Sequence, residues 1–232
     1  MDNQELFKTY FSLNNNELSI TVDNAVDHEI IFSKKMYLSK KQNKQISEEI
    51  ELFFLEKISE IEKKTKSFVK NIFLIIKNDE IFSIRLSLKK KFNNQTISDD
   101  EMKKQLINGL QLIYKHYPHH FIIHYVIDKF NIDGQDSFSI KDKTICDYLC
   151  IDLKFICIKK HFIEEFKKLF RKKEIYLEKV FSEDYLRQHN NREDNIIETI
   201  IKIENGLNNL EVKLVPKINE KKGFFENIFF SF

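Results

Sequence analysis

The chain has 232 residues, of which 42% are hydrophobic and 13% aromatic, so it can bury a core in one large domain or two small ones. Its 38 basic and 36 acidic side chains leave a net charge of +2, without the concentrated basic excess of a general nucleic-acid-binding protein, and we expect no nucleic acid as a partner. The first residues are polar and no uninterrupted apolar stretch follows them, so we expect no signal peptide and a cytoplasmic protein.

The first third of the chain predicts a small hairpin followed by a helix. Residues 10–13 and 18–22 have the composition of short strands joined by a turn of asparagines, and residues 29–32 predict a third strand. Ser47 then caps a helix whose apolar residues recur at helical spacing until the basic stretch at 63–66.

The middle of the chain alternates pairs of strands with helices. Ser98 and Glu101 form a capping box at the start of a second helix, which Pro118 ends. The other elements are predicted at residues 68–76, 81–88, 121–127, 148–158, 161–172 and 175–181. From residue 68 the order is strand, strand, helix, strand, strand, helix, strand, which predicts an α+β unit with helices against an open sheet. A helix near 194–204 and an apolar run at 210–215 follow.

The last dozen residues are rich in aromatic side chains and have the spacing of an amphipathic helix. Its apolar face would carry Phe224, Phe225, Ile228, Phe229 and Phe232. Lys221 and Lys222 precede this face, where they could meet anionic lipid headgroups, and Gly223 follows a polar linker. The segment is too short to span a bilayer. We expect a membrane-binding tail; the alternative is a terminal helix packed on the chain's own core.

Motifs of catalysis and cofactor binding are missing from the sequence. It has only four glycines, none of them in a phosphate-binding loop, and we expect no cofactor and no enzymatic activity. Cys146, Cys150, Cys157 and His161 superficially have the spacing of a zinc site. Strand alternation would send Cys150 and Cys157 to opposite faces, so we predict unpaired buried thiols and no metal.

Residues 122–135 resemble a segment of the bacterial cell-division protein FtsA, in the small subdomain inserted into its first lobe. The positions that match the family's motif are His124, Phe130, Asp133, Gly134 and Gln135. Residues 47–64, 68–88 and 149–158 resemble, in the same order, the helix before the subdomain, its opening strands and its later strand. The aromatic tail is similar to the family's membrane-targeting helix.

The residues of the matched motif also have a purely structural interpretation. A single histidine in an apolar strand is usually a satisfied core or edge residue, and Asp133 followed by Gly134 is first of all a turn. We therefore assign no catalytic residue.

The family's first phosphate loop would align with residues 12–17, where the chain departs from it. Ser12 stands at the family's aspartate, Asn14 at its glycine and Glu17 at its lysine. Such a degenerate loop is not expected to cradle phosphate. The second lobe, which docks FtsZ in the family, has no counterpart here, and this puts FtsZ in doubt as a partner.

The resemblance implies an α+β fold: a remnant of an actin-like first lobe that carries an SHS2-like subdomain. The expected division is residues 1–66 for the lobe remnant, 67–185 for the subdomain, 186–220 for a helix, short strand and linker, and 221–232 for the tail. The leading hypothesis is an FtsA-like division adaptor, independent of nucleotide and peripheral to the inner face of the cytoplasmic membrane, at the division site. The subdomain would bind other division proteins or a second copy of the chain.

Two alternatives stay open. One is a soluble α+β ligand-binding module or enzyme with the phenylalanine-rich helix packed in its own core. The other is a degraded gene product without function.

Overall fold

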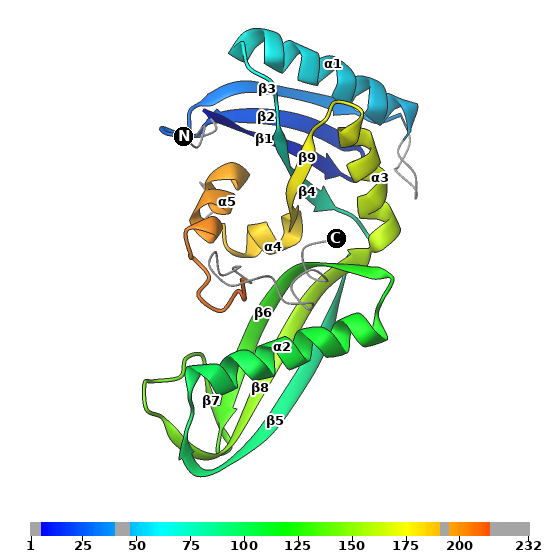
Figure 1. Ribbon diagram of the computed structural model, residues 1–232. Coiled ribbons are helices and arrows are strands. Elements are labelled where there is room, and N and C mark those ends of the chain that lie inside the picture. The colour runs from blue at the N-terminus through cyan, green and yellow to red at the C-terminus, as the bar shows by residue number, and fades with distance from the viewer. Residues whose placement is uncertain (1–5, 40–46, 191–194, 214–232) are drawn as a thin grey trace, which may run out of the picture.

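Two β-sheets organise the chain (Figure 1). The computed structural model describes residues 6–39, 47–190 and 195–213. One sheet has five strands in the order β3-β2-β1-β4-β9, and the other has four in the order β5-β8-β6-β7. The first is mixed and the second antiparallel, which makes this an α+β fold as the sequence predicts.

The five-stranded sheet begins as an antiparallel meander and continues with parallel strands. Its members are β1 (Phe7–Asn14), β2 (Glu17–Asn24), β3 (Ile30–Tyr37), β4 (Asn71–Lys77) and β9 (Tyr176–Ser182). β4 runs parallel to both β1 and β9, between which it lies. Five consecutive residues of β4, 72–76, are buried, as expected of a strand covered on both faces.

Two helices cover one face of this sheet and close its main core. They are α1 (Glu48–Thr65) and α3 (Lys160–Arg171). The ring of Phe11 on β1 has centroid distances of 5.8 to 6.4 Å to four phenylalanine rings, two from each helix: Phe53, Phe54, Phe166 and Phe170. The shorter helices α4 (Glu183–Gln188) and α5 (Ile196–Glu204) pack their apolar residues against Tyr10, Phe73 and Ile75 of the sheet.

The four-stranded sheet has one helix on one of its faces (Figure 1). It consists of β5 (Phe82–Thr96), β6 (His120–Ile132), β7 (Gln135–Ser137) and β8 (Ile145–Lys159), with α2 (Asp99–His116). α2 approaches the sheet closely at Gly109, where a Cβ atom would lie 2.6 Å from Leu153 Cδ1. A larger residue at this position would require the Leu153 side chain to move.

The predicted element order is found, but the prediction of one open sheet for the strands after residue 68 is wrong. β4 and β9 pair in the five-stranded sheet, so the range 67–185 contributes strands to both sheets. Parallel pairing needs crossover connections, and α1 and α3 lie in the connections that lead into β4 and β9. The prediction from the sequence also omitted α4 and β7, and it placed the end of β5 at residue 88, whereas the strand ends at residue 96.

The apolar run expected at 210–215 extends the edge of β6 over its described part. Glu211 forms an antiparallel bridge with Val126. Ile127 N donates to Leu210 O and Val212 N to Tyr125 O, both at 2.8 Å. The expected tail at 221–232 lies outside the described residues. Over residues 6–39, 47–190 and 195–213, no helix is long and apolar enough to cross a membrane.

Phe11→Ala is expected to destabilise the fold by about 3–5 kcal/mol, because it leaves a cavity among four packed rings. Urea unfolding followed by circular dichroism measures the change. Phe68→Ala is the matched control, since Phe68 is 78% exposed, and it should shift the free energy of unfolding by no more than about 0.5 kcal/mol. Equal effects of the two substitutions would contradict the placement of Phe11 at the centre of the core.

Candidate functional site

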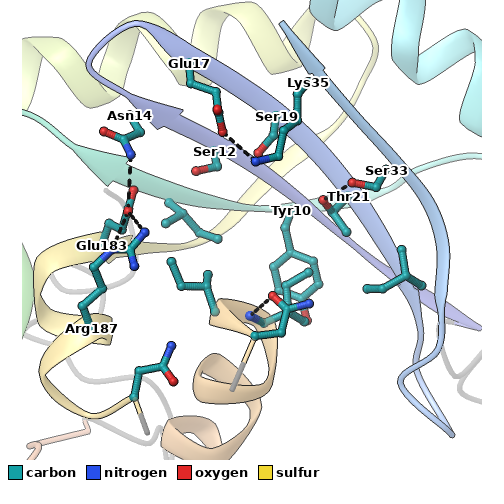
Figure 2. Close-up of a pocket in the computed structure, with 16 residues that line it drawn as sticks. Tyr10, Ser12, Asn14, Glu17, Ser19, Thr21, Ser33, Lys35, Glu183 and Arg187 are labelled. Carbon is teal, nitrogen blue, oxygen red and sulfur yellow. Dashed lines mark hydrogen bonds and ion pairs between the residues drawn. The ribbon is translucent and has the colours of Figure 1, made fainter. Parts of the chain in front are cut away.

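A polar cavity of about 380 Å³ lies on the face of the five-stranded sheet that α4 and α5 cover (Figure 2). β1, β2 and β3 supply one wall, and α4 and the start of α5 supply the other. The polar lining residues on the strands are Tyr10, Ser12, Asn14, Glu17, Ser19, Thr21, Ser33 and Lys35. Ser12, Asn14 and Glu17, which the sequence placed in a degenerate phosphate loop, are thus brought together at this cavity.

The turn between β1 and β2 forms one end of the cavity without any glycine. Asn14 pairs with Glu17 across it, and Asn15 has a φ of 43°, a left-handed conformation that asparagine tolerates. Asn15 N donates to Lys77 O at 3.3 Å, and Leu38 N donates to Asn16 O at 2.6 Å. These bonds tie the turn to β4 and to the end of β3. The Asn15 amide therefore points at protein and not into the cavity.

Among the described residues that line the cavity, the two cations are paired with carboxylates. Lys35 Nζ lies 2.9 Å from Glu17 Oε1, and this hydrogen bond lowers the pKa of Glu17 and raises that of Lys35. Arg187 Nη2 lies 2.6 Å and Nε 2.7 Å from Glu183 Oε1. Each pair is formally neutral, so the cavity offers no uncompensated positive charge from these residues to an anionic ligand.

Glu183 reaches the turn from the opposite wall (Figure 2). It is only 2% exposed, and its Oε1 also accepts a hydrogen bond of 3.4 Å from Asn14 Nδ2. Ser182 caps α4 and so places Glu183 at the first position of the helix, one turn before Arg187. The side chain that meets the turn is therefore an anion, which would repel a phosphate group.

Tyr10 is among the residues that line the cavity, and its hydroxyl is buried. The residue is 1% exposed, and its hydroxyl has no hydrogen-bond partner among the described residues. Burial raises the pKa of this hydroxyl, with smaller contributions from the charges of Asp23 and Glu204. Tyr10 therefore stays neutral at physiological pH and can only donate or accept a hydrogen bond.

His124 lies outside this cavity, at the junction between the two sheets. Its ring is 1% exposed and stacks on Tyr185 with a centroid distance of 3.9 Å. Nε2 accepts a 3.0 Å hydrogen bond from Ser182 N, and Nδ1 lies 2.9 Å from Glu211 Oε1. The His124 side chain of β6 thus connects the end of β9 to the bridge at residue 211, and both ring nitrogens are used in these hydrogen bonds.

The hydrogen bonds of His124 determine its protonation state. An Nε2 that accepts from a backbone amide carries no proton, so the neutral ring must donate from Nδ1 to Glu211. Burial lowers the pKa of His124, against the bond and the charge of Glu211, which raise it. Burial would raise the pKa of Glu211, but the hydrogen bond from His124, helped by the charge of Lys179, lowers it. The pair is therefore a neutral imidazole bonded to a carboxylate.

The remaining residues of the matched motif build a turn between β6 and β7. Asp133 has a φ of 48° and Gly134 a φ of 91°. The Asp133 carboxylate accepts from Asp147 N at 3.0 Å and from Tyr148 N at 2.7 Å, which holds the turn against the start of β8. Phe130 is buried in the core under α2, and Gln135 is exposed at the start of β7. These contacts belong to the architecture of the four-stranded sheet.

The three cysteines are free thiols. Cys146 and Cys157 are buried in the core under α2, whereas Cys150 lies on the other face of β8, as strand alternation predicts. Burial raises the pKa of Cys157 to about 12. Within the described part of the chain, no group of three or more His, Cys, Asp or Glu side chains could hold a metal ion.

Comparisons with known proteins give partial structural similarity. No protein-family model and no curated protein matches the sequence. A PilM–PilN complex of type IV pilus biogenesis has a TM-score of 0.46 at 7% identity, over 77% of this chain and 48% of that one. The cytoplasmic domain of EpsL, an inner membrane component of the type II secretion system of Vibrio cholerae, has a TM-score of 0.41 at 10% identity, over 81% of this chain and 60% of that one.

A third structure is a Bacteroides thetaiotaomicron protein with an actin-like ATPase fold and unknown function, with a TM-score of 0.33 at 10% identity. It is matched over 81% of this chain and 56% of its own length. The chain therefore spans less than two thirds of each of these three proteins. At these TM-scores the similarity is partial and concerns the fold alone.

The stability of the protein is expected to fall between pH 7.5 and pH 5.5 because of His124. The pKa of His124 is lower in the folded protein than in the unfolded chain. Its contribution to the free energy of unfolding is therefore complete above the ordinary histidine pKa of about 6.5. It is lost as the pH falls, by up to about 1 kcal/mol per pH unit. Thermal unfolding at several pH values measures this slope. His124→Gln should lower stability at pH 7.5 and flatten the slope, while His161→Gln, at an exposed histidine, should change neither. An unchanged slope in His124→Gln would contradict a neutral buried imidazole.

Proposed function

We propose that the chain is a nucleotide-independent adaptor of the FtsA type, which holds protein partners at the inner face of the cytoplasmic membrane and has no enzymatic activity. The observation that carries the proposal is the state of the cavity beside the β1–β2 turn. The cations among its described lining residues, Lys35 and Arg187, are each bound to a carboxylate, and Glu183 faces the turn. The site in which the resemblance would place phosphate groups is chemically unsuited to them.

The energetics of this arrangement oppose phosphate binding in two ways. A phosphate group that approached Asn14 would meet the buried carboxylate of Glu183 at close range. Freeing Arg187 for the ligand would leave that carboxylate buried without its ion pair, which is strongly destabilising. The turn also has no glycine at which backbone amides could approach the phosphates.

The protein-binding arm of the proposed adaptor is the four-stranded sheet with α2. This unit extends away from the five-stranded sheet in Figure 1. Its face opposite α2 packs against α4 and α5 at Val126 and Ile156, beside the junction of the two sheets. Its partners would be other division proteins or a second copy of the chain. The assignment to cell division rests on the sequence resemblance, which residues 122–135 carry with the order of the flanking elements and the aromatic tail. A contact with FtsZ is not part of the proposal.

The membrane arm is the segment 221–232, with its lysines and its aromatic face. Partial burial of several aromatic side chains at a lipid interface gives weak binding for a single tail, because ordering the peptide offsets much of the gain. Self-association would strengthen the attachment through effective concentration.

A second candidate function is a soluble ligand-binding module that uses the polar cavity. The observation in its favour is the buried hydroxyl of Tyr10, a residue that lines the cavity, which has no hydrogen-bond partner among the described residues. In that case the terminal phenylalanines would pack on the domain, and a chain that ends at residue 222 would be less stable than the full chain. An equally stable and more soluble truncated chain would support the adaptor.

Isothermal calorimetry should detect no ATP binding, with or without Mg²⁺, which corresponds to a Kd weaker than about 1 mM. The expectation follows from the paired charges of the cavity and from the acidic Glu183 at the turn. A matched titration with adenosine tests the cavity without the phosphates. Binding of ATP in the micromolar range would contradict a nucleotide-independent protein.

Co-sedimentation with vesicles that contain phosphatidylglycerol should retain the full chain and lose a chain truncated before Gly223. Phe225→Glu is expected to reduce the bound fraction several-fold, because it places a charge on the apolar face. Asn227→Glu adds the same charge off that face and serves as the control. Equal binding of the full and truncated chains would rule out the tail as the anchor.

A further inference from the structure

The outer edge of β5 is open along the four-stranded sheet. β5 lies at one end of the strand order and pairs with β8, and no other strand of the described residues pairs with it. It is 15 residues long, from Phe82 to Thr96. An open strand edge presents backbone N–H and C=O groups with which an extended chain can form a new ladder.

The side chains along this edge give it a positive charge on one face. Arg85, Lys89 and Lys91 alternate with less exposed residues, so all three point to the face of the sheet opposite α2. The Arg85 side chain is 76% exposed. The Nζ atoms of Lys89 and Lys91 lie 4.5 and 5.8 Å from the centre of the Tyr148 ring, which holds both ammonium groups over β8.

The neighbouring strands keep this face charged. Arg85 stands directly opposite Lys154 in the register of β5 and β8, an arrangement of like charges that is unfavourable in a sheet. Asp128 offsets part of it, with an oxygen 3.4 Å from Arg85 Nε. A hollow of about 390 Å³ opens beside Arg85, Asp128 and Asp152. Additional carboxylates from a ligand would relieve the repulsion between the opposed cations.

We propose that the edge of β5 binds an extended acidic segment of a protein partner by strand addition, with carboxylates at alternate positions facing Arg85, Lys89 and Lys91. The inference rests on the proposed adaptor function, for which it names the chemistry of the partner. The spacing of two residues along β5 sets the pattern: acidic side chains at every second position of an added strand lie on the same face as these cations.

A second copy of the chain fits the edge less well. A symmetric antiparallel pair of β5 strands centred anywhere from residue 87 to residue 90 brings Arg85, Lys89 or Lys91 opposite another of these cations. Nucleic acid and anionic lipid are also disfavoured, because Asp128 and Asp152 lie among the cations and would repel phosphate groups. A peptide can place neutral residues at those carboxylates.

Fluorescence anisotropy of the full chain with a labelled peptide of about twelve residues, alternating glutamate and threonine, tests the proposal. The double variant K89E/K91E should weaken binding by about tenfold or more. The control K103E/K115E makes the same charge change at two exposed residues of α2, the helix on the other face of the sheet. Its affinity for the peptide should stay within about twofold of that of the unaltered chain. Equal loss in both double variants, or no binding by the unaltered chain, would overturn the proposal.

Two further peptides test strand addition itself. One is N-methylated at the glutamates and the other at the threonines, so each lacks backbone donors along one edge only. One of the two should lose binding, and which one does reports the direction of the added strand. If both bind like the unmethylated peptide, the contact is made by charge alone and strand addition is refuted.

Vesicle binding separates this proposal from the adaptor function. K89E/K91E should co-sediment with phosphatidylglycerol vesicles as the unaltered chain does, because its tail is intact. Loss of vesicle binding in this variant would assign the basic face to lipid and overturn a peptide partner. Peptide binding by a chain that does not bind vesicles would retain the strand-addition site and contradict only the membrane arm.

Discussion

The position of β4 between β1 and β9 is the constraint on which the rest of the structure depends. β4 pairs in parallel with both strands, and its residues 72–76 are buried. Parallel neighbours require crossovers, so the chain must leave β4 and return before it can form β9. The four-stranded sheet lies within this excursion, which ends in α3. The adaptor's proposed binding unit is therefore an insertion between two adjacent strands of the main sheet.

The insertion is held in place by a small polar contact within an apolar junction. His124 on β6 bonds to Ser182 N at the end of β9 and to Glu211 on the bridge that extends β6. Phe181 and Tyr185 pack around its ring. Because a buried neutral imidazole can accept on one nitrogen and donate on the other, it satisfies both partners at once. The orientation of the two sheets is thus coupled to the described end of the chain.

Local signals predicted most of the elements but not which strands pair. Ser47 and Ser98 do cap α1 and α2, and the alternation of the strand at 148–158 correctly separated Cys150 from Cys157. Periodicity gives the burial of β4 but does not say which strand lies beside it, since that depends on contacts far apart in the sequence. The extension of β5 to residue 96 passes through Asn93 and Asn94, which both have a positive φ. Two asparagines in sequence resemble a turn, but in the structure they form an irregularity within the strand.

At the candidate site, too, the sequence did not reveal contacts between residues that are far apart in the chain. The residues of the turn, Ser12, Asn14 and Glu17, were found from the sequence, whereas Glu183 and Arg187 were not. Spaced by four residues after a serine cap, the latter pair has the pattern of an ordinary solvent-exposed helix pair, worth only a few tenths of a kcal/mol. In the structure Glu183 of this pair is buried, which makes the ion pair essential for its charge. At 2% exposure the Glu183 carboxylate depends on Arg187 and Asn14 to balance and solvate its charge. An anionic ligand that bound Arg187 would leave this carboxylate buried without its ion pair.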